Sequence, residues 1–311
     1  MKKQSRWVGF VLVILGATFW GIGGTVSQRL FQVDHISVEW LVSVRLLLTG
    51  LILIVLALFS KHRMKVFSIW KDKKAVFQLF LFGIFGMLAV QYTYMASINL
   101  GNAAVSTLLQ YLAPIYIILY LIITRVSKLQ VRDMIAVILA ITGTFLLLTN
   151  GSFTSLSVPF SSVFWGVLSG ISLAFYTLYA GPLLLKWGSL NIIGWAMIVG
   201  GAGLGFVHPP WQVDMSSWTM DTVMFLLFVI IFGTMFGFWF YLESLKYLKP
   251  QETSLLGSVE PLAAIITTVL WLRIPFGIFQ LVGTCLILIM VIYLSVIKDK
   301  NEIKEVSRRA V

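Results

Sequence analysis

Two long stretches without a charged residue constrain this chain more than any other feature. No Asp, Glu, Lys or Arg lies in the 50 residues between Lys74 and Arg125, or in the 52 between Asp133 and Lys186. A membrane-spanning helix needs about 20 apolar residues, so each stretch holds two such helices and a turn. Because 11% of all residues are charged, where a soluble domain has about 25%, the sequence predicts an all-α integral membrane protein.

Apolar segments along the chain predict ten membrane-spanning helices. They cover residues 7–29, 37–60, 75–98, 102–124, 130–149, 161–184, 189–207, 220–245, 251–272 and 275–297. A lipid bilayer is therefore the expected surrounding of most of the chain.

The basic residues predict how these spans are oriented. If the amino terminus is cytoplasmic, 20 of the 23 Lys and Arg residues lie on the cytoplasmic side, with Arg29 and Arg273 outside. Positive charge collects on that side of membrane proteins. Both termini are therefore expected in the cytoplasm and the protein in the plasma membrane. The net charge of +11 reflects this topology and does not indicate a nucleic-acid partner.

The chain also repeats itself. Segment 94–114, "YMASINLGNAAVSTLLQYLAP", resembles segment 241–261, "YLESLKYLKPQETSLLGSVEP", at a constant offset of 147 residues. The matched pairs include Tyr94 with Tyr241, Ser97 with Ser244, and Pro114 with Pro261. We therefore predict a first five-helix repeat at 1–149, an outer linker at 150–160, a second repeat at 161–297 and a cytoplasmic tail at 298–311.

Five spans per repeat is an odd number, so the second repeat must enter the membrane from the opposite face. Inverted-topology repeats are typical of secondary transporters, which expose a site near the bilayer midplane to each side in turn. Duplication for stability alone, without transport, is the alternative interpretation.

The order and spacing of several motifs resemble the EamA-type members of the drug/metabolite transporter superfamily. These motifs are "GATFWGIGG" in the first span, "SVRLLLTGL" in the second, and the paired segments ending in "LAP" and "VEP". The resemblance covers the chain apart from its tails. It implies a central cavity built by both halves and transport of a small metabolite, without saying which one.

Glu260 is the most informative candidate residue, since it lies beside Pro261 within the apolar run "LLGSVEPLAAIITTVLWL". A carboxylate inside the membrane is costly, and such residues usually mark substrate or proton pathways. Pro261 lacks a backbone N–H, which frees a carbonyl one turn earlier, near Gly257. The sequence predicts that Glu260 contacts a substrate amine or carries a coupling proton; a structural salt bridge is the alternative.

Arg45 is the expected partner in that salt bridge. It lies eight or nine residues into the second span, so its depth differs from that of Glu260 by about 6 Å at 1.5 Å per residue. Removing one partner of a buried ion pair typically costs about 3–5 kcal/mol. Structural and functional roles of Arg45 stay open at this point.

Neutral side chains complete the candidate site. Pro114 and Pro261 are expected to break their helices, and amides and rings are expected to line the cavity, where rings beside a carboxylate suit an organic cation. The amide and aromatic candidates are Gln91, Tyr94, Gln110, Trp20, Tyr111, Tyr176 and Trp239.

A membrane enzyme is the main rival class. His35, His62 and His208 lie far apart at span ends or in loops, and no catalytic or metal-binding motif is present. We therefore expect no enzyme activity, no metal and no cofactor. The inverted repeat predicts a secondary transporter. The resemblance to the EamA-type members implies export of an amino acid or related compound, with an organic cation as the alternative substrate and a proton as the coupling ion. Substrate, direction and oligomeric state stay open.

Overall fold

The structure, a computed structural model, describes residues 3–59, 65–216 and 218–296. Ten helical segments in this part of the chain are long and apolar enough to cross a membrane, which confirms the all-α class and the number of spans. The elements are α1 (Lys3–Gln32), α2 (Val38–Leu58), α3 (Lys65–Ser68), η1 (Ile69–Lys71), α4 (Lys73–Leu81), η2 (Phe82–Leu88), α5 (Ala89–Leu100), α6 (Ala103–Gln110), α7 (Ala113–Ile123), α8 (Val131–Thr149), α9 (Phe160–Trp187), α10 (Ser189–Val207), α11 (Met220–Ile230), η3 (Ile231–Phe236), α12 (Gly237–Ser244), α13 (Pro250–Gly257), α14 (Val259–Leu270) and α15 (Ile278–Val296). The predicted tail at 298–311 lies outside the described residues.

Four spans consist of more than one element. The third is built from α4, η2 and α5, the fourth from α6 and α7, the eighth from α11, η3 and α12, and the ninth from α13 and α14. The other six spans are single helices. The interruptions thus fall on the third and fourth spans of each half of the chain.

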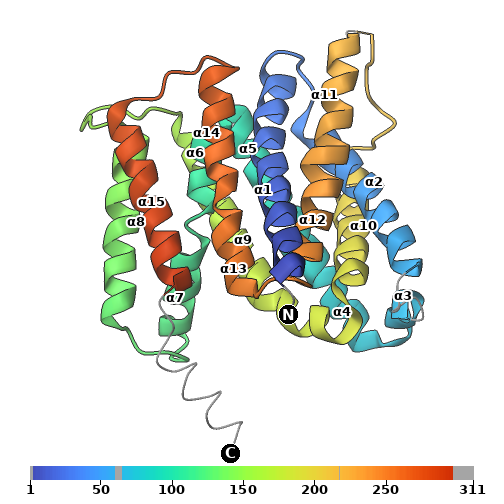
Figure 1. The fold of residues 1–311 in the computed structure, drawn as a ribbon. Helices are drawn as coiled ribbons and strands as arrows, with labels where there is room; N and C mark the ends of the chain where they lie inside the picture. The colour runs from blue at the N-terminus through green and yellow to red at the C-terminus, as the bar shows by residue number, and fades with distance from the viewer. Residues whose placement is uncertain (1–2, 60–64, 217, 297–311) are drawn as a thin grey trace, which may run out of the picture.

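The two halves run through the bundle in opposite directions. α1 begins at one end of the molecule, here called the near end, and α15 ends toward the same side (Figure 1). The segment between α8 and α9 lies at the other end, the far end (Figure 1). Because α9 begins at the far end, where α8 ends, the sixth span runs from the far end to the near end. The first span runs in the opposite direction. This direction is the one that an inverted repeat requires.

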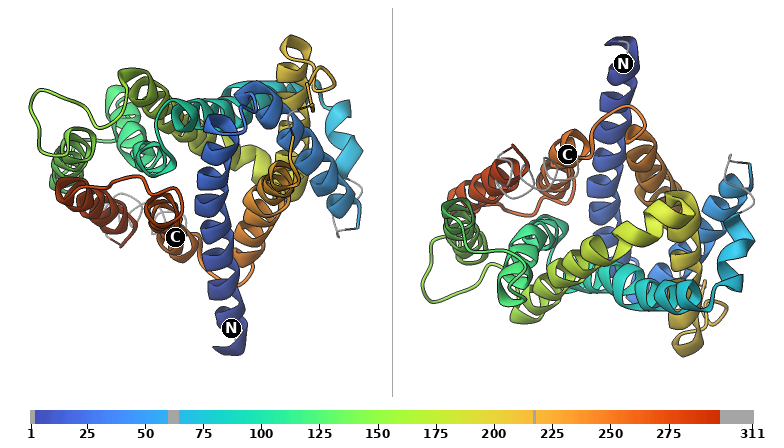
Figure 2. Two further views of the ribbon diagram at one scale, coloured as in Figure 1. Left: turned by 90° about the horizontal axis from the view of Figure 1, so that it is seen from above. Right: turned by 90° about the horizontal axis from the view of Figure 1, so that it is seen from below.

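The first span of each half packs against the other half. α1 contacts η3, α12 and α14, whereas α9 contacts α5, α6 and η2. Figure 2 shows α1 crossing the molecule beside these later segments. The halves are therefore intertwined, and a space between them is bounded by helices from both.

Spans of the same rank in each half also pack in pairs, α2 with α10 and α8 with α15. Glycines allow both contacts. A Cβ atom on Gly50 would lie 2.9 Å from the carbonyl oxygen of Gly194, and one on Gly143 would lie 2.9 Å from that of Gly283. Small residues let membrane helices approach closely, so these glycines fix where the halves meet.

Two spans contain a π-helical segment at matching places. Gly86 lies in η2 and Gly233 in η3, and they are separated by the same offset of 147 residues as the sequence repeat. π-helical turns widen a helix locally and frequently occur at functional sites. Both segments border the cavity described below, through Met87 and Gly233.

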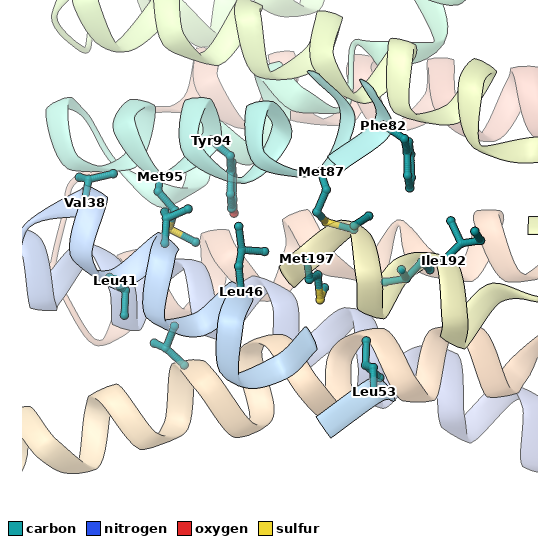
Figure 3. Packing of buried hydrophobic residues seen from close by; sticks show 14 of the residues in the cluster. Val38, Leu41, Leu46, Leu53, Phe82, Met87, Tyr94, Met95, Ile192 and Met197 are labelled. Atoms are coloured by element: carbon teal, nitrogen blue, oxygen red, sulfur yellow. The ribbon is translucent and has the colours of Figure 1, made fainter. Parts of the chain in front are cut away.

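Buried apolar side chains fill the contact between α2, α5 and α10. Leu46, Met95 and Met197 belong to one buried cluster that also includes Tyr94. Figure 3 shows the Tyr94 ring pointing from α5 toward α2, where Leu46 lies. This packing holds the helix that carries Tyr94 against the helix that carries Arg45.

Candidate functional site

A cavity of about 550 Å³ lies between the two halves. Its wall includes Leu184 and Leu245, close to the ends of α9 and α12 at the near end, and continues to Arg45 and Met95 deeper in the bundle. Most of the wall is apolar. The predicted site residues that line it are Trp20, Arg45, Gln91, Tyr94, Gln110, Tyr111, Tyr176 and Glu260, together with Pro114.

The fourth and ninth spans break at the cavity wall. In the fourth, α6 ends at Gln110 and α7 begins at Ala113. In the ninth, α13 ends at Gly257 and α14 begins at Val259. Each break lies just before the proline of the repeat, as the sequence predicts. Broken helices are tolerated inside a membrane where the backbone lines a cavity or packs on protein.

The break in the ninth span is completed by a side chain from the fourth. Pro261 has no N–H to give to the carbonyl of Gly257, four residues earlier. The Tyr111 hydroxyl donates to that carbonyl oxygen at 2.8 Å. This contact gives the Gly257 carbonyl, which the sequence predicts to lose its helical partner, a donor from another span, and it joins the two broken spans directly.

Glu260 lies in the first turn of α14, and its Oε2 atom is 3.1 Å from the Tyr111 hydroxyl oxygen. Its side chain is partly exposed to the cavity. Its backbone carbonyl packs on Gly21 of α1, where a Cβ atom would clash with it. The carboxyl group is thus held between α1 and the break in the fourth span, facing the cavity.

Arg45 is 4% exposed and reaches the cavity from α2. Its guanidinium donates to the amide oxygen of Gln91 on α5. Among the described residues, none accepts a hydrogen bond from its Nε atom. A buried cation beside a neutral amide keeps most of its desolvation cost.

The salt bridge between Arg45 and Glu260, the alternative interpretation of the sequence, is not formed among the described residues. Within residues 3–59, 65–216 and 218–296, neither side chain belongs to an ion pair within 4.0 Å. Tyr94 lines the same cavity, close enough to both to interact with them electrostatically, and its hydroxyl bonds Thr107 at 2.8 Å. The cavity therefore carries one acidic and one basic group, each held by a neutral partner.

Aromatic rings form the wall beside Glu260. The Trp20 ring lies 5.2 Å from Tyr241 and 5.1 Å from Phe238, measured between centroids. Tyr241 and Phe238 line the cavity, although the sequence did not single them out as site residues. Tyr241 could have been found, because it matches Tyr94 in the repeat.

Two predicted site residues, Pro261 and Trp239, do not line the cavity. Trp239 lies one residue after Phe238, so its side chain points elsewhere on the helix, and it stacks on Phe236 at 5.9 Å. Gln110, in contrast, lies at the wall and donates to the Ser169 hydroxyl at 2.7 Å. In the described part of the chain, no cluster of three His, Cys, Asp or Glu side chains could hold a metal ion.

Polar contacts join the two halves at the far end. Ser97 of α5 donates to the carbonyl of Ser162 in α9 at 2.8 Å. Thr222 at the start of α11 donates to Asp34, in the turn after α1, at 3.1 Å. Since the cavity wall reaches the near-end termini of α9 and α12, this conformation holds the far end together and extends its cavity toward the near end.

The EamA-like transporter family model matches the chain twice, over residues 7–149 and 160–296. An uncharacterized inner membrane transporter of Salmonella typhimurium, YicL, is 32% identical over 289 residues, which covers 92% of this chain and 95% of that protein. An uncharacterized transporter of Archaeoglobus fulgidus is 24% identical over 261 residues, or 81% of this chain and 83% of that protein. A solved crystal structure shares the fold with a TM-score of 0.59 at 14% identity, covering 94% of this chain and 97% of the other.

Proposed function

Because the chain belongs to the EamA-like transporter family of the drug/metabolite transporter superfamily, and is thus a multi-pass membrane transporter, we propose that it is a secondary transporter that moves a small metabolite by alternating access. The observation that carries this proposal is the cavity between the halves, with an acidic group and a basic group on separate walls. The energy comes from a gradient of solute or ions, and a proton is the proposed coupling ion. The protein lies in the plasma membrane with both termini in the cytoplasm.

Alternating access is supported by the matched features of the two halves. Opposite chain direction, π-helical segments at the same offset and breaks before Pro114 and Pro261 make each half a similar unit. Two such units can exchange conformations around a site near the midplane. The contacts at the far end and the near-end extent of the cavity belong to one of the two states. In the other state, the far-end contacts separate and the cavity reaches the far end.

An amino acid or closely related zwitterion is the proposed substrate. Its ammonium group would meet Glu260 and its carboxylate would meet Arg45, whose guanidinium has a neutral partner. Ligand pockets typically occupy about 300–1,000 Å³, so the volume of about 550 Å³ accepts a molecule of this size. Export is the proposed direction.

An organic cation is the second candidate substrate. Trp20 packs against both Tyr241 and Phe238, on the cavity wall that also carries Glu260. Aromatic faces and a carboxylate together bind quaternary ammonium groups. Such a substrate would use the aromatic wall and leave Arg45 without a contact.

A thermal-shift screen of purified protein in detergent against amino acids and quaternary amines tests this proposal. A ligand at 100 times its Kd stabilises a protein by about 2.7 kcal/mol, which a melting curve resolves. We expect a zwitterion to stabilise the wild type and to lose its effect in both Glu260→Gln and Arg45→Gln. An organic cation should lose its effect in Glu260→Gln alone.

Glu243→Gln is the matched control, since Glu243 pairs with Lys246 at the end of α12 and lies outside the cavity wall. It should keep every ligand response. Transport by Glu260→Gln at the wild-type rate in proteoliposomes would falsify the role of Glu260. If both Glu260→Gln and Arg45→Gln keep the ligand response, the ligand does not bind through these two side chains.

A further inference from the structure

Three oxygen atoms meet at the break in the ninth span. The Tyr111 hydroxyl oxygen lies 2.8 Å from the carbonyl oxygen of Gly257 and 3.1 Å from Oε2 of Glu260. Both separations are hydrogen-bond distances for O–H···O pairs or slightly longer. The middle oxygen belongs to a tyrosine, which has one hydroxyl hydrogen to donate and lone pairs to accept.

Two hydrogen bonds between three oxygens need two hydrogens. The carbonyl of Gly257 has none, and it can receive the hydroxyl hydrogen only from Tyr111. An ionised Glu260 accepts only, so the second bond needs a proton on the carboxyl group itself. We propose that Glu260 holds a proton in this conformation and donates it to Tyr111, whose own hydrogen is committed to the Gly257 carbonyl.

The surroundings of Glu260 agree with a neutral carboxyl group. Tyr94 from α5, Tyr241 from α12 and Tyr111 from the end of α6 are the titratable groups that face it, and Arg45 on α2 is the charged group across the cavity. From α1 its neighbour is Gly21. No cation within the described residues lies in ion-pair distance of Glu260. A charge without a partner in this setting is costly.

The arrangement makes Tyr111 a positioning residue. When the proton leaves Glu260 for the cavity, the carboxylate attracts the Tyr111 hydrogen, since bonds to charged acceptors are the stronger ones. The Gly257 carbonyl then loses the Tyr111 donor at the break between α13 and α14. Proton binding at Glu260 is thereby linked to the backbone of the ninth span. This inference rests on the proposed function, in which Glu260 meets the substrate or the coupling proton.

Infrared spectroscopy of the full-length protein in lipid, without ligand, tests the proton directly. The C=O stretch of a protonated carboxyl group absorbs at a higher wavenumber than the stretching bands of an ionised carboxylate. Among the acidic residues that the structure describes, Glu260 is the one that lies inside a span rather than at a span end or in a loop. We expect a protonated-carboxyl band at neutral pH in the wild type and its loss in Glu260→Gln.

Tyr111→Phe removes the acceptor of the proposed bond. We expect the band to stay and to shift to higher wavenumber, because a carboxyl group that loses its hydrogen-bond partner has a stiffer C=O bond. Tyr120→Phe is the control, since Tyr120 is 54% exposed on α7 and lies outside the cavity wall. It should leave the band unmoved. Melting curves of each variant establish that it is folded.

A wild-type spectrum at neutral pH without the band would overturn the proposal, because Tyr111 would then share one hydrogen between two acceptors. A band that does not move in Tyr111→Phe would remove Tyr111 as the acceptor. Neither result depends on a ligand. The ligand screen of the proposed function can therefore succeed while this inference fails, and this inference can hold while the screen finds no ligand.

Discussion

The guanidinium of Arg45 donates to the amide oxygen of Gln91, a neutral partner, on the cavity wall between α2 and α5. Both side chains are buried, at 4% and 7% exposure. Arg45 therefore depends on Gln91 for its hydrogen bonding in the folded protein. Variants of Arg45 and Gln91 therefore test the structural role of this pair through protein stability, without a ligand.

We expect Gln91→Leu to lower the stability of the protein by about 1.5–3 kcal/mol, the usual worth of a hydrogen bond to a charged group. Arg45→Met should cost less, since it removes the buried charge together with its desolvation penalty. The double variant should be more stable than Gln91→Leu alone. Melting temperatures of the three variants measure this, and additive losses would contradict the coupling.

Gly143→Ala should destabilise the protein by disturbing the contact of α8 with α15. Its new Cβ atom would lie 2.9 Å from the Gly283 carbonyl oxygen, and overpacking typically costs about 1–3 kcal/mol. Gly181→Ala is the control, because that position in α9 has nothing within 4 Å of the added atom. It should be neutral or stabilising, as alanine favours helix by up to about 1 kcal/mol. Equal melting temperatures for the two variants would contradict the packing role of Gly143.

Trp20→Ala should weaken the response to any ligand found in the screen, whereas Trp239→Ala should not. Trp20 lines the cavity against Tyr241, and Trp239 does not line it. Titration of the ligand in thermal-shift experiments gives the Kd of each variant. A larger loss of affinity in Trp239→Ala would place the binding site elsewhere.

Asp72, which precedes α4 at the near end, should make stability depend on acid pH. A hydrogen bond from Lys186, and then one from the Ala75 backbone N–H, lower the pKa of the Asp72 carboxyl below its usual value. The ionised carboxylate of Asp72 therefore adds to the free energy of unfolding. This contribution is complete above the pKa that Asp72 has in the unfolded state, and it is lost as the pH falls through its pKa in the folded state.

Asp72→Asn should thus melt below the wild type at neutral pH, and the two should converge in the acid range below the folded pKa of Asp72. Melting curves across that range provide the measurement. Asp214→Asn is a comparison outside this contact, since Asp214 bonds Ser216 in the segment between α10 and α11. A difference between wild type and Asp72→Asn that persists unchanged in acid would show that the carboxylate charge is not the cause.

The sequence could predict the spans and the helix breaks because these depend on local properties. Span length follows from apolar run length, and the opening at Gly257 follows from the missing N–H of Pro261. Tyr111 as the donor that fills this opening could not be read from the sequence, because it comes from 146 residues away.

The faces of the helices were harder to predict. Depth along a span is given by the residue count, but rotation about the helix axis depends on packing with other helices. For this reason the depth of Arg45 left a salt bridge with Glu260 open as the alternative, whereas Arg45 bonds Gln91. Trp239 was expected at the cavity and packs on Phe236. The π-helical segments η2 and η3 also shift the register within their spans, and nothing in the local sequence marked them.

The intertwined first span has a consequence for the time course of synthesis. Thr25 of α1 bonds Thr267 of α14 at 2.7 Å, across 242 residues of chain. At a synthesis rate of about 5–20 residues per second, α1 waits roughly 10 to 50 s before that partner exists. A ribosome stalled after the first repeat would therefore leave Gly21 and Thr25 of α1 in the bilayer without their packing partners in α14.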